Sequence, residues 1–92
     1  MARVRIELPS LLQRFVGGAR EIEVQADTLA GALKELSRAH PALELHLFDE
    51  SGTFREHVLC FHNGTNTRWL TDLDRPLTDG DTLTFLQAVS GG

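Results

Sequence analysis

The 92-residue chain has a single cysteine, Cys60, which excludes an internal disulfide bond. No apolar run approaches the length of a membrane-spanning helix, and the opening MARVRIELPS lacks the apolar stretch of a signal peptide. Basic residues are scattered singly, and nine Lys and Arg against thirteen Asp and Glu give a formal net charge of −4. Because a nucleic-acid-binding face needs clustered Lys and Arg, we expect a cytoplasmic protein that binds neither nucleic acid nor membrane.

An arrangement of catalytic side chains is also missing. The chain has no Ser-His-Asp pattern, no paired-carboxylate site and no glycine loop of the kind that cradles phosphate. Asp79-Gly80-Asp81 is typical of a turn, and Cys60 lies between apolar neighbours in an expected strand, as a core residue does. The histidines lack metal-ligand spacing, so no metal site is predicted. They are His40, His46, His57 and His62.

Alternating apolar and polar residues predict a sheet. The clearest strand is the first, over residues 3–8, which Pro9 ends. Gly17-Gly18 supplies a turn towards the second strand, and Asn63-Gly64 is a strong hairpin signal between two later strands. The further strands are expected over residues 20–25, 57–62, 67–70 and 82–89.

A change to helical spacing follows the second strand. Apolar residues recurring at i, i+3, i+4 and i+7 predict an amphipathic helix that Thr28 caps and that ends near Ala39 or His40, before Pro41. Residues 42–48 have alternating leucines, which fit a strand, but a proline at their start favours a short helix. Strands on both sides of one main helix predict an α+β domain with the helix across one sheet face, compatible with a β-grasp and with other small α+β sheets.

Two strands carry apolar residues on both faces. If Leu83 and Phe85 enter the core, Leu86 emerges on the opposite face, and Leu59 and Phe61 do the same on the strand over residues 57–62. A sheet with its helix on one side needs only one apolar face. The three residues therefore predict an exposed patch for binding a partner, with cover by loops as the alternative.

The sequence finishes with AVSGG, residues 88–92. Gly17-Gly18 shows that a glycine pair can be a plain turn, but Gly91-Gly92 follows a strand. We expect Gly92 to present a free carboxylate on a stem without side chains, which fits a channel too narrow for a Cβ atom. The pair is thus either a loose end or the functional group of the protein.

The terminal DGDTLTFLQAVSGG resembles the MoaD/ThiS-type ubiquitin-like sulfur carriers. The RVRIEL strand, the DTLAGALKEL helix and the NG hairpin fit the β-grasp order of that family, and the AVSGG ending looks closest to its CysO-like, cysteine-synthesis branch. The resemblance implies one domain over residues 1–92, a mixed four- to five-stranded sheet and a flexible tail over 88–92. Gln87 departs from the proline that many relatives have there, which leaves the exit of the tail freer.

The resemblance implies chemistry on Gly92, with Gly91 beside it. An ATP-dependent activating enzyme similar to ubiquitin-activating enzymes would adenylate the carboxylate, and sulfide or a persulfide would displace AMP to leave a thiocarboxylate. That sulfur would be donated in the biosynthesis of cysteine, molybdopterin, thiamin or a related product. The carrier itself would be no enzyme and would have no cofactor of its own, since ATP belongs to the activating partner.

The resemblance also implies partners. They are the adenylating enzyme, a sulfur-accepting synthase (a PLP-dependent cysteine synthase or the large subunit of molybdopterin synthase) and a JAMM-type metallopeptidase. Two other functions remain open: a ubiquitin-like modifier conjugated through Gly92, and an interaction module without chemistry. The residues expected to contact partners are Leu59, Phe61, Leu86, Val89 and Ser90.

Overall fold

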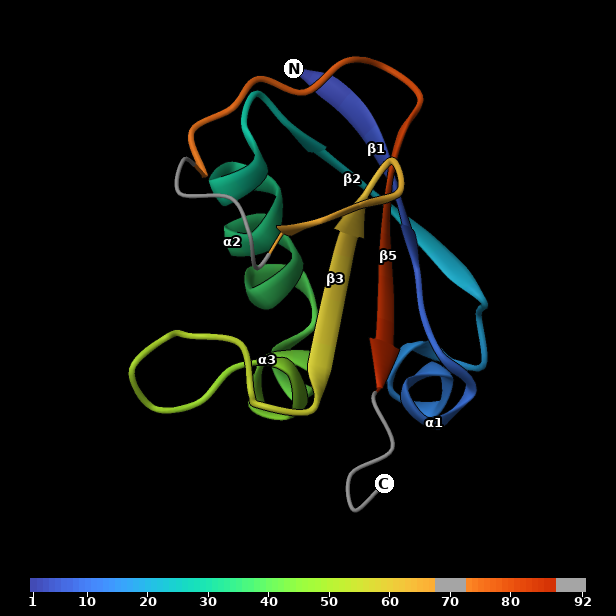
Figure 1. Ribbon diagram of the computed structural model, residues 1–92. Coiled ribbons are helices and arrows are strands. Elements are labelled where there is room, and N and C mark those ends of the chain that lie inside the picture. Colours follow the sequence, from blue (N-terminus) through green and yellow to red (C-terminus); the bar gives the residue numbers. More distant parts are fainter. Residues whose placement is uncertain (68–72, 88–92) are drawn as a thin grey trace.

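The computed structural model describes residues 1–67 and 73–87 of the chain. Its centre is a five-stranded sheet with the strand order β2-β1-β5-β3-β4, shown in Figure 1. β1 and β5 run parallel, and the other neighbouring strands pair antiparallel, so the expected mixed sheet is confirmed. The strands are β1 (Ala2–Glu7), β2 (Glu21–Ala26), β3 (Val58–His62), β4 (Thr65–Asn66) and β5 (Asp81–Gln87).

The main helix, α2 (Leu29–Ala39), has the predicted bounds. Its N-cap Thr28 accepts a hydrogen bond at 3.1 Å from the backbone amide of Gly31 to its side-chain oxygen, which satisfies one of the free donors of the first turn. The apolar stripe of the helix is buried against the sheet, as its spacing predicts. Its buried residues are Leu29, Ala32, Leu33 and Leu36.

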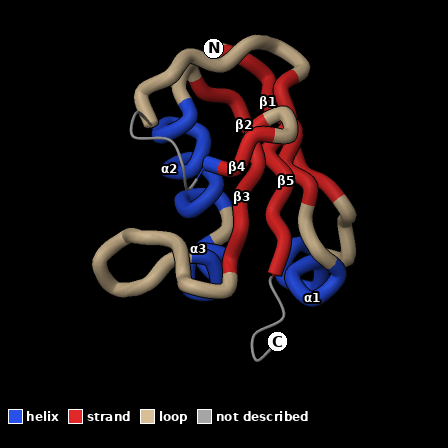
Figure 2. Tube along the Cα trace, viewed as in Figure 1, coloured by secondary structure: helices blue, strands red, loops and turns tan. Residues whose placement is uncertain are grey.

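The ambiguous segment after Pro41 is a helix, α3 (Pro41–Leu47), so the short-helix interpretation is confirmed. Proline occupies the start of the helix, where its missing N–H is not needed, and Leu43 and Leu47 are buried one turn apart. Two further short elements were not predicted: α1 (Ser10–Gln13) and the 3₁₀ helix η1 (Arg14–Val16). Figure 2 shows α1 near the end of β5 and α3 on the other side of that end.

The bounds of two strands, β4 and β5, differ from those predicted from the sequence. Asn63 and Gly64 have φ angles of 49° and 90°, as the tight hairpin turn requires, and this turn places Thr65 opposite His62. The short strand β4 is therefore Thr65–Asn66, and the prediction of residues 67–70 was wrong at Thr67, while 68–70 lie outside the described residues. β5 ends at Gln87, and 88–89 of the predicted strand also lie outside.

One hydrophobic core fills the space between the sheet and the helices. Its most deeply buried residues on β1 and β5 have at most 1% of their surface exposed, and they are Val4, Ile6, Leu83 and Phe85. Within the described residues, no helix is both long and apolar enough to cross a membrane.

Candidate functional site

The strand that leads towards the two glycines, β5, lies inside the sheet between β1 and β3. Leu83 and Phe85 point into the core, with 0% and 1% of their surface exposed, whereas Leu86 is 44% exposed on the opposite face. The alternation predicted for this strand is confirmed. β5 thus anchors its C-terminal end in the core while presenting one large apolar side chain to the outside.

Leu86 has apolar company on the neighbouring strand. Leu59 of β3 is its direct cross-strand partner, and Phe61 pairs with Thr84 on the same face. Leu59 and Phe61 are half-buried, while Val58 and Cys60, which alternate with them along β3, are buried in the core. We refer to Leu59, Phe61 and Leu86 as the apolar half of the open sheet face, and the prediction that they share this face is confirmed.

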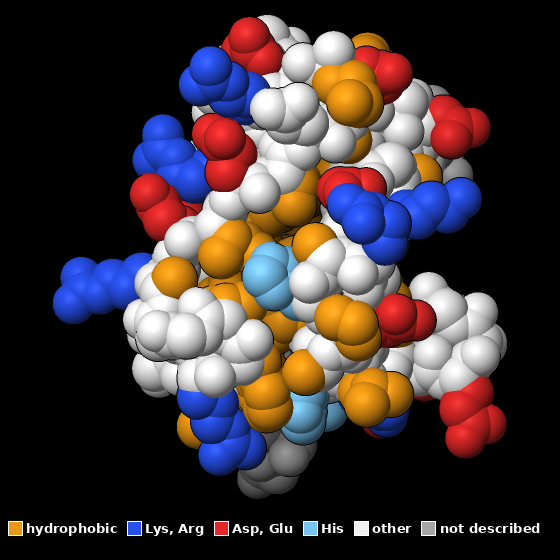
Figure 3. Space-filling view, turned by 180° about the vertical axis from the view of Figure 1, so that it is seen from behind, with side chains coloured by type: hydrophobic (Ala, Val, Ile, Leu, Met, Phe, Trp, Pro, Cys, Tyr) orange, Lys and Arg blue, Asp and Glu red, His pale blue; other side chains and the backbone are white. Residues whose placement is uncertain are grey.

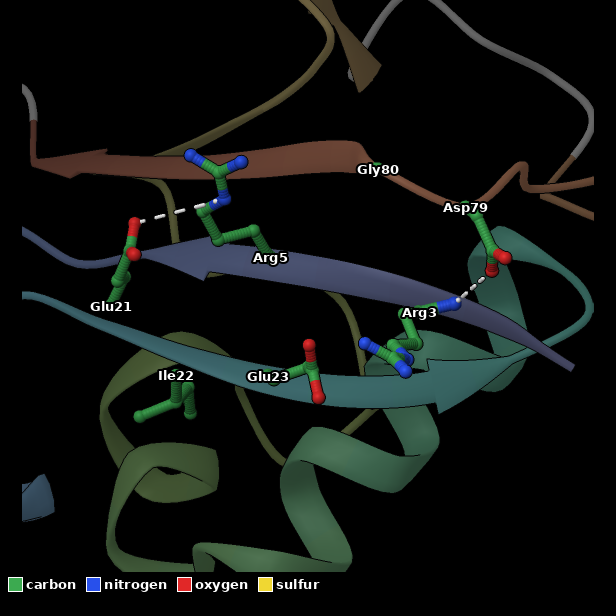
Figure 4. A pocket seen from close by; sticks show the side chains of 7 residues that line it. All are labelled: Arg3, Arg5, Glu21, Ile22, Glu23, Asp79 and Gly80. Atoms are coloured by element: carbon green, nitrogen blue, oxygen red, sulfur yellow. Dashed lines mark hydrogen bonds and ion pairs between the residues drawn. The ribbon is translucent and has the colours of Figure 1, made fainter.

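The other half of this open face carries charge. Arg3 and Arg5 of β1 lie beside Glu21 and Glu23 of β2, and we refer to these four residues as the charged half. Figure 3, seen from behind the view of Figure 1, shows acidic and basic side chains alternating along its upper left margin. Arg5 Nε lies 3.9 Å from Glu21 Oε2. Figure 4 marks this pair with a dashed line and shows Ile22 pointing the other way, towards the helices.

Asp81 ties the far end of β5 to its surroundings. One carboxylate oxygen accepts from the Thr78 amide at 3.0 Å and lies 3.0 Å from His62 Nε2, and the other accepts from the Asn63 side chain at 2.9 Å. Desolvation acts to raise the pKa of Asp81, but these hydrogen bonds outweigh it and lower the pKa from 3.8 to about 2. The turn predicted at Asp79-Gly80 is confirmed, since the Asp81 amide donates to the Thr78 carbonyl at 3.0 Å. Asp79 Oδ1 also accepts from the Arg3 amide at 2.8 Å.

The titratable side chains show no site for nucleophilic or metal chemistry among the described residues. Burial raises the pKa of Cys60 to about 12, which keeps the thiol protonated at neutral pH, as expected of a core residue. His62 is buried, His46 stacks on Phe15, and His57 is exposed. No group of three or more potential ligands occurs in residues 1–67 and 73–87.

At the end of β5 there is a groove that the sequence did not reveal. It has a volume of about 330 Å³ and is lined by α1 and η1, by His46 of α3 and by Gln87. Gln87, the departure noted in the sequence, pairs with Val58 as the last residue of β5. The predicted site residues Val89, Ser90, Gly91 and Gly92 lie beyond it, outside the described residues.

Comparisons with known proteins agree with this architecture. The ThiS family model matches residues 6–92, a range that includes Gly91 and Gly92. The sulfur carrier protein CysO of Mycobacterium tuberculosis is 29% identical over 91 residues, which cover 97% of this chain and 98% of the relative. Small archaeal modifier protein 1 of Haloferax volcanii is 35% identical over 80 residues, covering 84% and 87%.

A solved structure gives the same answer for the fold. The matching chain of the Amycolatopsis orientalis BexX/CysO complex superposes with a TM-score of 0.81 at 27% identity, covering 97% of this chain and 99% of that one. The β-grasp expectation is therefore confirmed. The chain belongs to the ThiS family, within the MoaD/ThiS-type ubiquitin-like sulfur carriers.

Proposed function

We propose that this protein is a sulfur carrier that works through the carboxylate of Gly92. The observation that carries the proposal is the family match through residue 92, which includes both glycines. The similarity to CysO supports it, and so does β5, which presents Leu86 one residue before Gln87 and the tail. The same similarity favours the cysteine-synthesis branch.

The proposed chemistry needs no acid or base from the carrier. A carboxylate is a poor electrophile, so one of its oxygens first attacks the α-phosphorus of ATP on the activating enzyme, and pyrophosphate leaves. Sulfide then attacks the acyl carbon, AMP leaves, and Gly92 holds a thiocarboxylate. Its sulfur is the nucleophile that an accepting synthase uses, so the chain is a co-substrate of its partner enzymes rather than an enzyme.

Each part of the carrier then has a physical task. Gly91 and Gly92 have no Cβ atom, so they fit a narrow channel leading to a buried active site. The apolar half provides a docking surface, since exposed apolar patches mark sites of protein contact. The BexX/CysO complex supports complex formation by a related carrier. We assign the adenylating enzyme, a sulfur-accepting synthase and a JAMM-type metallopeptidase to this chain as partners.

Intact-protein mass spectrometry tests the proposal. The chain is incubated with ATP, sulfide and the adenylating enzyme of its own organism, and we expect the mass increase of one oxygen replaced by sulfur. A variant lacking Gly92 should give no product and should keep the melting temperature of the full chain, because the deletion leaves β5 and the core intact. Unchanged mass in the presence of an enzyme that activates other carriers would refute the proposal.

A second function has its own support in the 35% identity to small archaeal modifier protein 1. A modifier would carry Gly92 in an isopeptide bond to lysine side chains of other proteins. Affinity capture of a tagged chain from its own organism, followed by peptide mass spectrometry, separates the two functions. Branched peptides ending in Gly91-Gly92 support the modifier, and a terminal thiocarboxylate without such peptides supports the carrier.

A further inference from the structure

The groove at the end of β5 lies on the opposite side of that strand from the apolar half. Gln87 pairs with Val58 in the core-facing register, while Leu86 pairs with Leu59 on the open face. Figure 1 shows β5 ending between α1 and α3, both of which contribute residues to the groove. At its C-terminal end, β5 therefore has the apolar half on one side and the groove on the other, and the tail follows directly after Gln87.

Local contacts hold the groove in shape. The Gln13 side chain donates to the Leu8 carbonyl at 3.1 Å, which fixes α1 to the end of β1, and Leu12 anchors the helix in the core. Phe15 stacks on His46 with 4.3 Å between ring centroids and so joins η1 to α3. The opposite side of α1 leaves Leu11 69% exposed at the groove.

The charge of this groove differs from that of the chain. No acidic residue lines it among the described residues, although the whole chain carries a formal net charge of −4. Arg14 Cζ lies 4.9 Å from the centroid of the Phe15 ring, and Arg14 forms no ion pair with any described residue. The pocket beside Arg3 and Arg5 is lined by acids as well.

We propose that this groove is a second docking surface, which binds an acidic segment with an apolar side chain on the adenylating enzyme as that enzyme receives the tail. This inference rests on the proposed function and names the chemistry of its partner. The guanidinium of Arg14 presents a planar fork that suits a carboxylate. Because it already lies over the Phe15 ring, the side chain loses less conformational entropy on binding. Leu11 supplies the apolar contact, so the receiving protein surrounds the tail from both faces of β5.

Two charge reversals test the proposal. Arg14→Glu should weaken binding to the purified adenylating enzyme by roughly tenfold, because it places like charges together at the edge of the interface. Lys34→Glu makes the same change of charge on α2, away from the groove lining, and should leave affinity within about twofold. Calorimetry without ATP measures both, so the result does not depend on whether a thiocarboxylate forms.

A synthetic peptide tests binding at the groove without the adenylating enzyme and without the thiocarboxylate chemistry. A peptide of alternating aspartate and leucine should shift the amide resonances of Leu11, Arg14 and His46, and a lysine–leucine peptide should not. Equal affinities of the Arg14→Glu and Lys34→Glu variants would overturn the proposal. Shifts at the same amides on deleting residues 88–92 from the free protein would also overturn it, because the occupant would then be the chain's own tail.

Discussion

The open face of the sheet contrasts two pairs of strands that share one backbone alternation and differ in their side chains. On β1 and β2, the outward positions include Arg3, Arg5, Glu21 and Glu23, which are exposed to water. On β3 and β5, the outward positions include Leu59, Phe61 and Leu86. One layer of helices covers the inner face under both pairs, so helix packing does not require the apolar residues outside.

This contrast separates residues whose character the folded domain requires from residues whose character it does not require. The side chains of the charged half are hydrated by water, and their charges discourage β2, an edge strand, from pairing with another chain. The apolar half lies on β3 and β5, the second of which leads to the tail, and its exposure supports the proposed docking of a partner protein there. The difference teaches that one sheet face can be divided into a charged half and an apolar half without any change in the helix layer behind it. The predictions below test that division.

The largest effect is expected at Leu86. Leu86→Asp should weaken binding to the adenylating enzyme by about 2 kcal/mol, roughly 30-fold, because it places a charge in the centre of an apolar contact. Arg5→Asp creates the same residue on the charged half and should change affinity far less. Calorimetry measures both, and thermal melts check the fold. A collapse in stability of the Leu86 variant would mean that Leu86 belongs to the core.

The next largest effect is expected at Asp81, whose carboxylate joins the start of β5 to the end of β3 through His62. Its native pKa of about 2 lies below its ordinary value of 3.8, so its contribution to stability is present above about pH 4 and is lost as the pH falls towards 2. Asp81→Asn should lower the free energy of unfolding at pH 7 by about 1–2 kcal/mol. Urea unfolding at pH 7 and at pH 3 should show the gap to the parent chain narrowing. A constant gap would contradict this role.

A smaller effect is expected where the two halves meet. The Thr84 hydroxyl of β5 donates to Glu7 Oε1 of β1 at 2.7 Å. Thr84→Val removes this donor and should reduce stability by about 1 kcal/mol or less, whereas Thr84→Ser retains the bond and should lose less. Urea unfolding of both variants decides the matter. Equal losses would show that the hydrogen bond contributes nothing and that only the methyl group matters.

The smallest effect belongs to the charged half. Arg5 and Glu21 are 54% and 52% exposed, with 3.9 Å between their charged atoms. A double-mutant cycle with Arg5→Ala and Glu21→Ala should give a coupling below about 0.5 kcal/mol, and salt should abolish it. A coupling above 1 kcal/mol would show that this half is held together more tightly than a solvated surface.

Local sequence signals predicted much of the fold. Val4 and Ile6 on β1, the Thr28 cap of α2 and the Asn63-Gly64 turn each rest on neighbouring residues, and each prediction is confirmed. The parallel pairing of β1 with β5 joins residues far apart in the sequence, so the local alternation of apolar and polar residues cannot predict it. α1 was missed because four residues are too few to show a helical period.

The candidate site divides in the same way. The apolar half could be predicted because two strands with apolar residues on both faces exceed what one helix layer buries, and the register of Leu59 with Leu86 agrees. The groove could not be predicted because it requires Arg14, His46 and Gln87 to meet from three elements. The roles of Gly91 and Gly92 remain predictions, since these residues lie outside the described part of the chain.

The central position of β5 has a mechanical consequence. Ladder hydrogen bonds lie across the strands, and β5 is bonded to β1 on one side and to β3 on the other. A pull along the C-terminal end of β5 therefore loads both ladders in shear, so that their bonds bear the force together instead of opening one after another. An edge strand would peel. Under the proposed function, a partner that draws in the tail would pull against both ladders together, so the domain would resist the pull as one unit.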